Sequence, residues 1–170
     1  MTIISNTTVL SNFAAIGQLE LLERLYTMLY ISTEVYAEIQ AGLNEGYRFY
    51  AGIEAHIYPL AATGWIHLTS VTGEQELQLQ VRLPQRLHSG EASCLAIAKQ
   101  RGWILLTDDL AARKQAARMS IQVSGSIGCL VMAVERKILT LEQANHWLNV
   151  LQQYNYRSPV TDLTPLLPRH

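Results

Sequence analysis

The chain has 170 residues, enough to bury a hydrophobic core in one domain without disulfide bonds or a structural metal. Hydrophobic residues make up 49% of the chain and charged residues only 16%, so we expect a partner, such as a second copy of the chain, to cover part of the surface. The formal net charge of −1 excludes a global basic field that attracts nucleic acid, although a local basic strip would suffice.

Short apolar runs alternate with helical patterns, which predicts βα units around a parallel sheet. The predicted strands are, in chain order, residues 2–5, 28–31, 65–71, 103–107 and 121–123. The predicted helices are residues 9–16, 19–25, 32–43, 47–58, 73–81, 89–98, 110–119, 126–136 and 140–151. With no internal repeat or linker, we expect one domain at residues 1–157, followed by a proline-containing tail at residues 158–170.

Four polar side chains lie where separate strand–helix units would bring them together. Asn6 follows the first strand and Asp109 the fourth, while Glu38 and Glu91 lie early in two helices. In an open parallel sheet, ligands bind outside the carboxyl ends of the strands. Acidic side chains gathered there repel one another unless a divalent cation neutralises them, so this cluster is a candidate metal site.

Each acidic residue also has a purely structural interpretation. Glu38 borders the apolar face of its helix, where a surface glutamate is common. Glu91 falls in the first turn of its helix, where the helix dipole stabilises a negative charge. Either Asp108 or Asp109 can cap the helix that follows them, but a single cap leaves the other aspartate unexplained.

Two further features are candidates for contacting phosphate groups. Lys114 and Arg118 share one face of the helix after Asp109, and Arg113 precedes them on the same helix. Ser126 begins another helix, whose free N–H groups can bind a phosphate. A solvated helix face and a simple strand–helix turn are the more common causes of these patterns. The histidines show no metal-ligand spacing, and no Walker-type glycine loop occurs, which argues against nucleoside-triphosphate chemistry.

The sequence indicates a reducing, cytoplasmic environment. Cys94 and Cys129 lie far apart in apolar helical stretches, as buried free thiols do. The first residues lack the charged and apolar regions of a signal peptide, and no apolar run approaches the roughly 20 residues that span a bilayer. We therefore expect a soluble protein without membrane association.

Several short motifs follow one another in a characteristic order and spacing. They are Ile3-Ile4-Ser5-Asn6-Thr7-Thr8-Val9-Leu10, Val35-x-x-Glu38-Ile39, Gly90-Glu91-Ala92-x-x-Leu95-Ala96-x-Ala98, Leu105-Leu106-Thr107-Asp108-Asp109-x-Ala111-Ala112-Arg113 and Val123-Ser124-Gly125-Ser126-Ile127-Gly128. Over about residues 2–155 the series resembles the PIN domain. It is most similar to the uncharacterised bacterial and archaeal PIN-like proteins related to the toxin nucleases of toxin–antitoxin pairs.

The resemblance implies a fold, an activity and partners. The fold is a three-layer α/β/α sandwich with a central parallel sheet of about five strands in the order 3-2-1-4-5. The activity is hydrolysis of RNA phosphodiesters with Mg²⁺ or Mn²⁺. The implied partners are the RNA substrate, a second copy of the chain in a homodimer and, for a toxin, an antitoxin protein.

The resemblance also implies site residues. The expected metal ligands are Asn6, Glu38, Glu91, Asp108 and Asp109, of which Glu38, Glu91 and Asp109 would be catalytic. Thr7 matches the small hydroxyl residue that follows the first acid of the family. The expected substrate contacts are Thr7, Thr107, Arg113, Lys114 and Ser126.

Asn6 departs from the family pattern, which has aspartate at this position. An amide oxygen can ligate a cation but lacks the charge that offsets the dehydration of Mg²⁺, so we predict weakened metal binding and weakened cleavage. The alternative is a degenerate PIN domain that binds RNA or protein without cutting. A receiver-type signalling domain is disfavoured, because Asn6 and Thr7 do not supply paired acids after the first strand.

Overall fold

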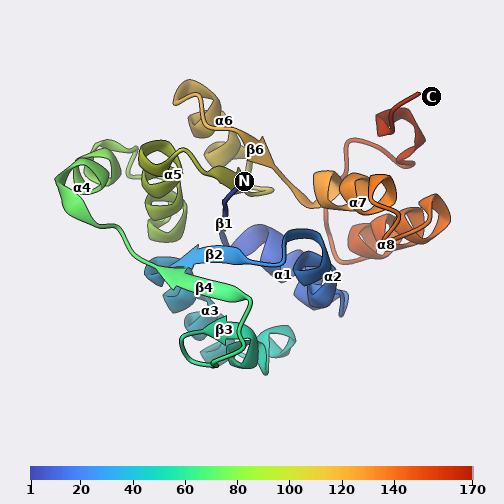
Figure 1. The fold of residues 1–170 in the computed structure, drawn as a ribbon, viewed down its shortest axis with the longest axis horizontal. Helices are drawn as coiled ribbons and strands as arrows, with labels where there is room; N and C mark the ends of the chain where they lie inside the picture. Colours follow the sequence, from blue (N-terminus) through green and yellow to red (C-terminus); the bar gives the residue numbers. More distant parts are fainter. Residues whose placement is uncertain (170) are drawn as a thin grey trace.

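Six strands form one parallel sheet at the centre of the structure, a computed structural model that describes residues 1–169 (Figure 1). The strand order is β3-β4-β2-β1-β5-β6, and every neighbouring pair is parallel. The strands are β1 (Ile3–Ser5), β2 (Leu29–Ser32), β3 (Ile57–Tyr58), β4 (Ile66–Thr69), β5 (Ile104–Leu106) and β6 (Val123–Ser124).

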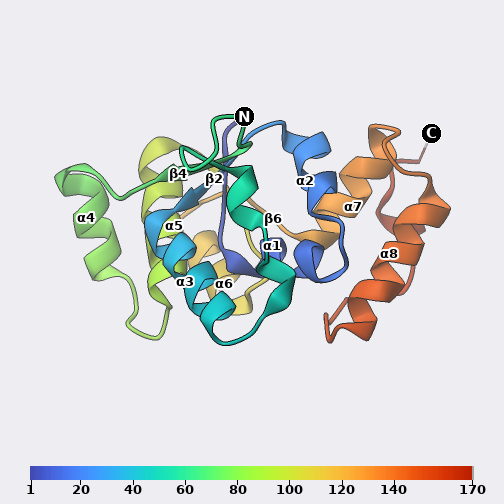
Figure 2. The same ribbon diagram turned by 90° about the horizontal axis from the view of Figure 1, so that it is seen from below.

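Helices cover both faces of this sheet, which makes the fold a three-layer α/β/α sandwich (Figures 1 and 2). On one side α3 and α5 pack against the strands, and α4 and α6 pack against α5; on the other side lie α1, α2 and α7, with α8 outside α7. The helices are α1 (Thr7–Ala15), α2 (Leu19–Tyr26), α3 (Thr33–Asn44), α4 (Gly73–Arg82), α5 (Ser89–Arg101), α6 (Leu110–Arg118), α7 (Ser126–Glu135) and α8 (Leu141–Gln153).

The predicted fold class is confirmed, with one strand added. The five predicted strands become β1, β2, β4, β5 and β6, and their order across the sheet is the expected 3-2-1-4-5. The two-residue strand β3 extends the sheet beyond β4. The last predicted strand, residues 121–123, is displaced toward the C-terminus, since the strand forms at Val123–Ser124.

The helix predicted at residues 47–58 does not form. That segment contains two 3-10 turns, η1 (Arg48–Tyr50) and η2 (Ile53–His56), followed by β3. Gly52 lies between the two turns at φ 82°, a left-handed conformation that a continuous right-handed helix cannot contain. Tyr50 and Ile53 are nevertheless buried. The spacing of apolar residues in this segment therefore identifies buried positions correctly, although the segment is not helical.

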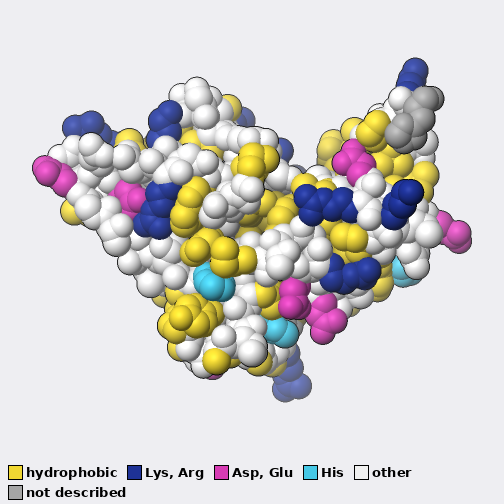
Figure 3. All heavy atoms as spheres, in the orientation of Figure 1, with side chains coloured by type: hydrophobic (Ala, Val, Ile, Leu, Met, Phe, Trp, Pro, Cys, Tyr) yellow, Lys and Arg dark blue, Asp and Glu magenta, His cyan; other side chains and the backbone are white. Residues whose placement is uncertain are grey.

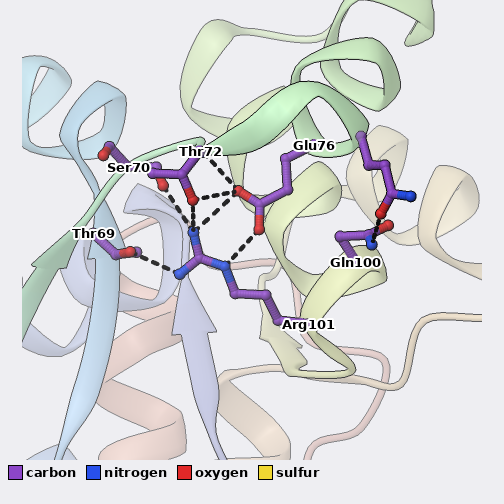
Figure 4. Close-up of polar contacts among 7 residues, drawn as sticks. Thr69, Ser70, Thr72, Glu76, Gln100 and Arg101 are labelled. Carbon is purple, nitrogen blue, oxygen red and sulfur yellow. Dashed lines mark hydrogen bonds and ion pairs between the residues drawn. The ribbon is translucent and has the colours of Figure 1, made fainter.

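Helix α5 is the buried centre of one helical layer. All residues from Gly90 to Ala98 are buried, because the helix contacts α3, α4, β1, β2 and β5 together. The sequence predicts this burial through its apolar residues on every face. Its C-terminal residue Arg101 forms a bridge to α4 that Figure 4 shows in detail.

The segment after residue 157 packs against α8. Leu163 is fully buried, and its backbone N–H donates to Asn145 Oδ1 at 2.9 Å. A 3-10 turn, η3 (Thr164–Leu166), follows, and His170, the last residue of the predicted tail, lies outside the described residues. Among residues 1–169, no helix is both long enough and apolar enough to span a membrane.

Candidate active site

Asn6 follows β1 and caps α1 with a buried side chain. Its Oδ1 accepts hydrogen bonds from the backbone N–H of Thr8 at 3.2 Å and from the Thr8 hydroxyl at 2.7 Å. Its Nδ2 donates to Thr107 Oγ1, beyond the end of the neighbouring strand β5, at 2.6 Å. The residue is 1% exposed, and both the oxygen and the nitrogen of its amide are hydrogen-bonded to other residues of the protein.

Glu38 reaches from α3 to the N-terminus of α5. Its Oε1 accepts the backbone N–H of Gly90 at 2.9 Å, and its Oε2 accepts the Thr7 hydroxyl at 3.3 Å. A Cβ at position 90 would lie 2.5 Å from Glu38 Oε1. Glycine is therefore required at this point for the carboxylate to approach the helix end.

Glu91 lies in the first turn of α5 and is 9% exposed. Its Oε2 accepts the backbone N–H of His88 at 3.1 Å, one half of a capping box. Burial raises the pKa of this carboxyl, the hydrogen bond from His88 opposes the rise, and the charges of Asp109 and Glu38 add to it. The hydrogen bond from Gly90 holds the Glu38 carboxylate at the same helix start as Glu91, and Asp109 lies at the start of α6, beyond the end of β5.

Asp108 and Asp109 point in different directions although they are adjacent. Asp109 caps α6, since its Oδ2 accepts the backbone N–H of Ala112 at 2.8 Å. Asp108 faces the N-terminus of α7, where its carboxylate accepts the backbone N–H of Ser126 at 2.8 Å, the Ser126 hydroxyl, and Asn12 Nδ2 at 2.8 Å. The predicted ligand Asp108 is thus directed to α7, and the N–H of Ser126 is not free for a phosphate.

The other predicted substrate contacts divide into buried and exposed groups. Thr107 is fully buried, and its hydroxyl accepts hydrogen bonds from Asn6 and from the backbone N–H of Asp109, so it positions these residues and cannot touch a substrate. Arg113 Nη1 donates to the carbonyl of Thr107 at 2.8 Å. Arg113 and Lys114 are exposed on α6.

Comparison with known proteins identifies the family of this chain. The sequence model of a family described as the PIN domain matches residues 2–169. The chain belongs to the PIN domain family. Proteins of this family are generally metal-dependent nucleases. No curated protein matches the chain.

One similar solved structure is a PilT N-terminus domain protein from the hyperthermophilic archaeon Sulfolobus solfataricus P2. The two share 11% sequence identity at a TM-score of 0.50, over 79% of this chain and 95% of that chain. At this identity the likeness concerns the fold alone. It agrees with the three-layer sandwich of this PIN domain.

The oxygen donors of this PIN domain suit a hard divalent cation in chemistry, but their present arrangement does not enclose one. Within residues 1–169, no group of three or more His, Cys, Asp or Glu side chains is close enough to hold a single ion. The oxygens of Asn6, Glu91 and Asp109 each accept a hydrogen bond from the backbone N–H at a helix start. A bound Mg²⁺ or Mn²⁺ would compete with these N–H groups for the same oxygens.

Two clefts open on either side of the N-terminus of α1, and both are lined by Thr8 and Ser11. A cleft of about 330 Å³ lies toward Asp109 and the end of α8, and a cleft of about 380 Å³ lies toward Glu38 and η1. Residues that the sequence interpretation missed connect the two sides. The Thr8 hydroxyl accepts the N–H of Asp108 at 2.8 Å while it donates to Asn6.

A signal for these missed residues exists in the sequence. Thr8 and Asn12 are one turn apart on α1, so they share one face of the helix. A polar face next to a strand end predicts contact with polar residues of the neighbouring strand ends. Asn12 makes this contact with Asp108, and Thr8 makes it with the backbone of the same residue.

Proposed function

We propose that this PIN domain is a cytoplasmic ribonuclease that hydrolyses RNA phosphodiesters with Mg²⁺ or Mn²⁺, and that Asn6 weakens its affinity for the cation. The observation that supports the proposal is that Glu38 bonds to the backbone N–H of Gly90, next to Glu91, at the edge of the sheet where Asp109 also begins a helix. Burial and the charges of Asp109 and Glu38 raise the pKa of Glu91. A divalent cation between these groups would relieve their repulsion, so binding a cation would lower the free energy of the protein.

In the proposed mechanism, Glu38, Glu91 and Asp109 would hold the cation, with the Asn6 amide as a neutral fourth ligand. When bound, the cation supplies an acidified water and stabilises negative charge on the phosphate. Helices α1, α5 and α6 begin at this site, and their N-termini carry partial positive charge that also favours a phosphate. Thr7 keeps the Glu38 carboxylate oriented through its hydroxyl. The donor set requires no side-chain nucleophile.

Cleavage of a labelled RNA tests this function. We expect cleavage in Mn²⁺, none in EDTA, and a loss of about 100-fold or more in Glu38→Gln and in Asp109→Asn, because each substitution removes a charge that holds the cation. Asparagine is also a good helix cap, so Asp109→Asn removes the charge without removing the cap of α6. The matched control is Glu34→Gln on the same helix as Glu38. Equal cleavage by both variants and the unmodified protein, or cleavage that persists in EDTA, would exclude the proposed site.

The second candidate is a PIN domain that binds RNA or a protein without cutting. It is favoured by the buried amide of Asn6, both ends of which are satisfied by Thr8 and Thr107 without a metal ion. This candidate predicts RNA association that is the same in Mn²⁺ and in EDTA, with no cleavage at any Mn²⁺ concentration. The ribonuclease predicts that cleavage appears as Mn²⁺ is raised.

A homodimer, and a toxin role with an antitoxin as partner, belong to the same proposal. Two observations support a covered surface: Leu77 and Val81, one turn apart on α4, are 54% and 75% exposed, and hydrophobic side chains gather over β2 and β4 in Figure 3. We expect light scattering to give the mass of a dimer, and Val81→Glu to give that of a monomer. A monomer at high concentration of the unmodified protein would contradict the homodimer.

A further inference from the structure

Two exposed aromatic rings stand in the loop after α3. Tyr47 is 52% exposed and Phe49 is 39% exposed. Their rings lie nearly parallel, at an interplanar angle of 19° with centroids 5.7 Å apart. Together they offer flat apolar surface of the kind on which nucleic-acid bases stack without regard to sequence.

The position of these rings is fixed by the end of α3. The backbone N–H of Tyr47 donates to the carbonyl of Gly42 at 2.9 Å. A Cβ at position 42 would lie 3.1 Å from Tyr47 Cδ2 and 3.2 Å from Tyr50 Cε2, so glycine lets both rings pack closely on the helix. Phe49 packs on the buried Tyr50, with ring centroids 4.6 Å apart. A preorganised aromatic surface binds a ligand with little loss of side-chain freedom.

The aromatic pair shares a cleft with the acidic site. The cleft of about 380 Å³ is lined by Tyr47 and Phe49 and also by Glu38 and Thr7. Tyr50, which packs against Phe49, is also influenced by the Glu38 carboxylate. Burial, with a contribution from the charge of Glu38, raises the pKa of the Tyr50 phenol to about 12. A ligand stacked on Tyr47 would therefore lie beside Glu38.

We propose that this cleft binds an unpaired nucleobase of single-stranded RNA, stacked on Tyr47 and Phe49, and so brings the adjoining phosphate to Glu38. The inference rests on the proposed ribonuclease function and assigns the residues that hold a base of its substrate. A base inside a duplex is stacked on both faces by its neighbours, so it cannot also stack on the protein. Only an unpaired base can therefore stack on Tyr47 and Phe49.

Binding of a labelled uridine octanucleotide, measured by fluorescence anisotropy in EDTA, tests the inference without the cation. We expect Tyr47→Ala to raise the dissociation constant about tenfold, the usual loss on removing one stacking ring. Phe49→Ala should weaken binding in the same direction, and Tyr47→Phe should bind as the unmodified protein does. The matched control is Tyr58→Ala, which removes a 45% exposed tyrosine from β3.

A second oligonucleotide, of the same length with abasic sites in place of the bases, separates stacking from attraction to the backbone. Its affinity should not change in Tyr47→Ala. Equal loss of affinity for both oligonucleotides, no loss for either, or no binding by the unmodified protein at the highest soluble RNA concentration would overturn the inference. Circular dichroism of Tyr47→Phe and Tyr47→Ala verifies that both variants are folded.

The outcome also distinguishes this inference from the ribonuclease function itself. Base-dependent binding through Tyr47 without any cleavage in Mn²⁺ would leave the nucleobase site standing and remove the nuclease. If the protein cleaves RNA in Mn²⁺ and Tyr47→Ala does not slow cleavage at RNA concentrations below saturation, the ribonuclease function stands and the nucleobase site is removed.

Discussion

At the scale of single residues, Asn6 occupies a position where charge and hydrogen bonding conflict. It is 1% exposed, and its Nδ2 donates to Thr107. An aspartate has no such donor, so the Thr107 hydroxyl would have to turn and donate instead. The aspartate would also place one more negative charge beside Glu91 and Asp109. The amide thus stabilises the metal-free protein, whereas a carboxylate would favour the metal-bound one.

Asn6→Asp should therefore change metal affinity and stability in opposite directions. We expect Mn²⁺ to bind at least about tenfold more tightly by calorimetry, because one added charge within reach of the ion contributes more than the 1.4 kcal/mol of a tenfold change. In EDTA, we expect the free energy of unfolding to fall by about 1–3 kcal/mol. Asn149→Asp, on the exposed side of α8, is the control for the charge alone. Unchanged Mn²⁺ affinity would remove position 6 from the metal site.

Glu91→Gln should stabilise the metal-free protein at neutral pH. The pKa of Glu91 is raised in the folded state, chiefly by burial, so the folded protein holds this proton more tightly than the unfolded chain does. The charged carboxylate consequently opposes folding above the pKa of the unfolded chain, and this cost disappears as the pH falls through the folded pKa. Glutamine is uncharged and still accepts the His88 N–H.

Thermal unfolding in EDTA measures this effect. Glu91→Gln should have the higher Tm at pH 7, and the difference should shrink as the pH approaches 4. The exposed Glu142→Gln on α8 is the control. A Tm of Glu91→Gln below that of the unmodified protein at pH 7 would show that the carboxylate stabilises the fold.

Sequence reasoning at this scale located the residues but not their hydrogen bonds. Asp109 was expected as a cap or a ligand, and it caps α6. Asp108 was expected beside it as a ligand, yet it binds the start of α7. The direction of each side chain depends on donors supplied by Asn12 and Ser126, which are distant in sequence, and no local pattern contains that information.

At the scale of elements, Arg101 joins α5 to the β4–α4 connection. Its Nε donates to Glu76 Oε1 at 2.6 Å, and its other nitrogens contact Thr69 Oγ1 at 2.9 Å and the Ser70 carbonyl at 2.8 Å, as Figure 4 shows. Glu76 in turn accepts the backbone N–H of Thr72 at the start of α4. One guanidinium thus fixes the place where the chain leaves β4 and enters α4.

Removing this bridge should destabilise the fold in a pH-dependent way. Arg101→Met should lower the free energy of unfolding by about 2–3 kcal/mol at pH 7, because it leaves the largely buried Glu76 without its partner. The hydrogen bond from Arg101 lowers the pKa of Glu76 in the folded state. The stabilisation is therefore complete above the unfolded pKa of about 4.3 and is lost as the pH falls through the lower folded value.

Urea unfolding between pH 7 and pH 3 measures this loss. Glu76→Gln should flatten the acid side of the stability curve, whereas Glu74→Gln, on the exposed face of the same helix, should leave it unchanged. An acid limb that persists in Glu76→Gln would assign the acid sensitivity to another carboxyl. The sequence predicts α4 but not this ion pair, since its partners are on different helices.

At the scale of the whole molecule, the sequence predicts most of the architecture because hydrophobic periodicity records which faces are buried. The five main strands, their order and the edge that carries the acidic residues follow from that pattern and from the family resemblance. The segment containing η1, η2 and β3 was mispredicted, because the left-handed Gly52 breaks a spacing that otherwise suits a helix. The aromatic pair of Tyr47 and Phe49 belongs to this same segment.

The central claim, that acidic side chains from separate elements converge to bind one divalent cation, is tested most directly by Mn²⁺ titration followed by electron paramagnetic resonance. We expect the unmodified protein to bind Mn²⁺ weakly and saturably, and Glu38→Gln, Glu91→Gln and Asp109→Asn each to weaken that binding about tenfold or more, while Glu34→Gln does not. No saturable binding by the unmodified protein, or equal binding by all four variants, would contradict the claim.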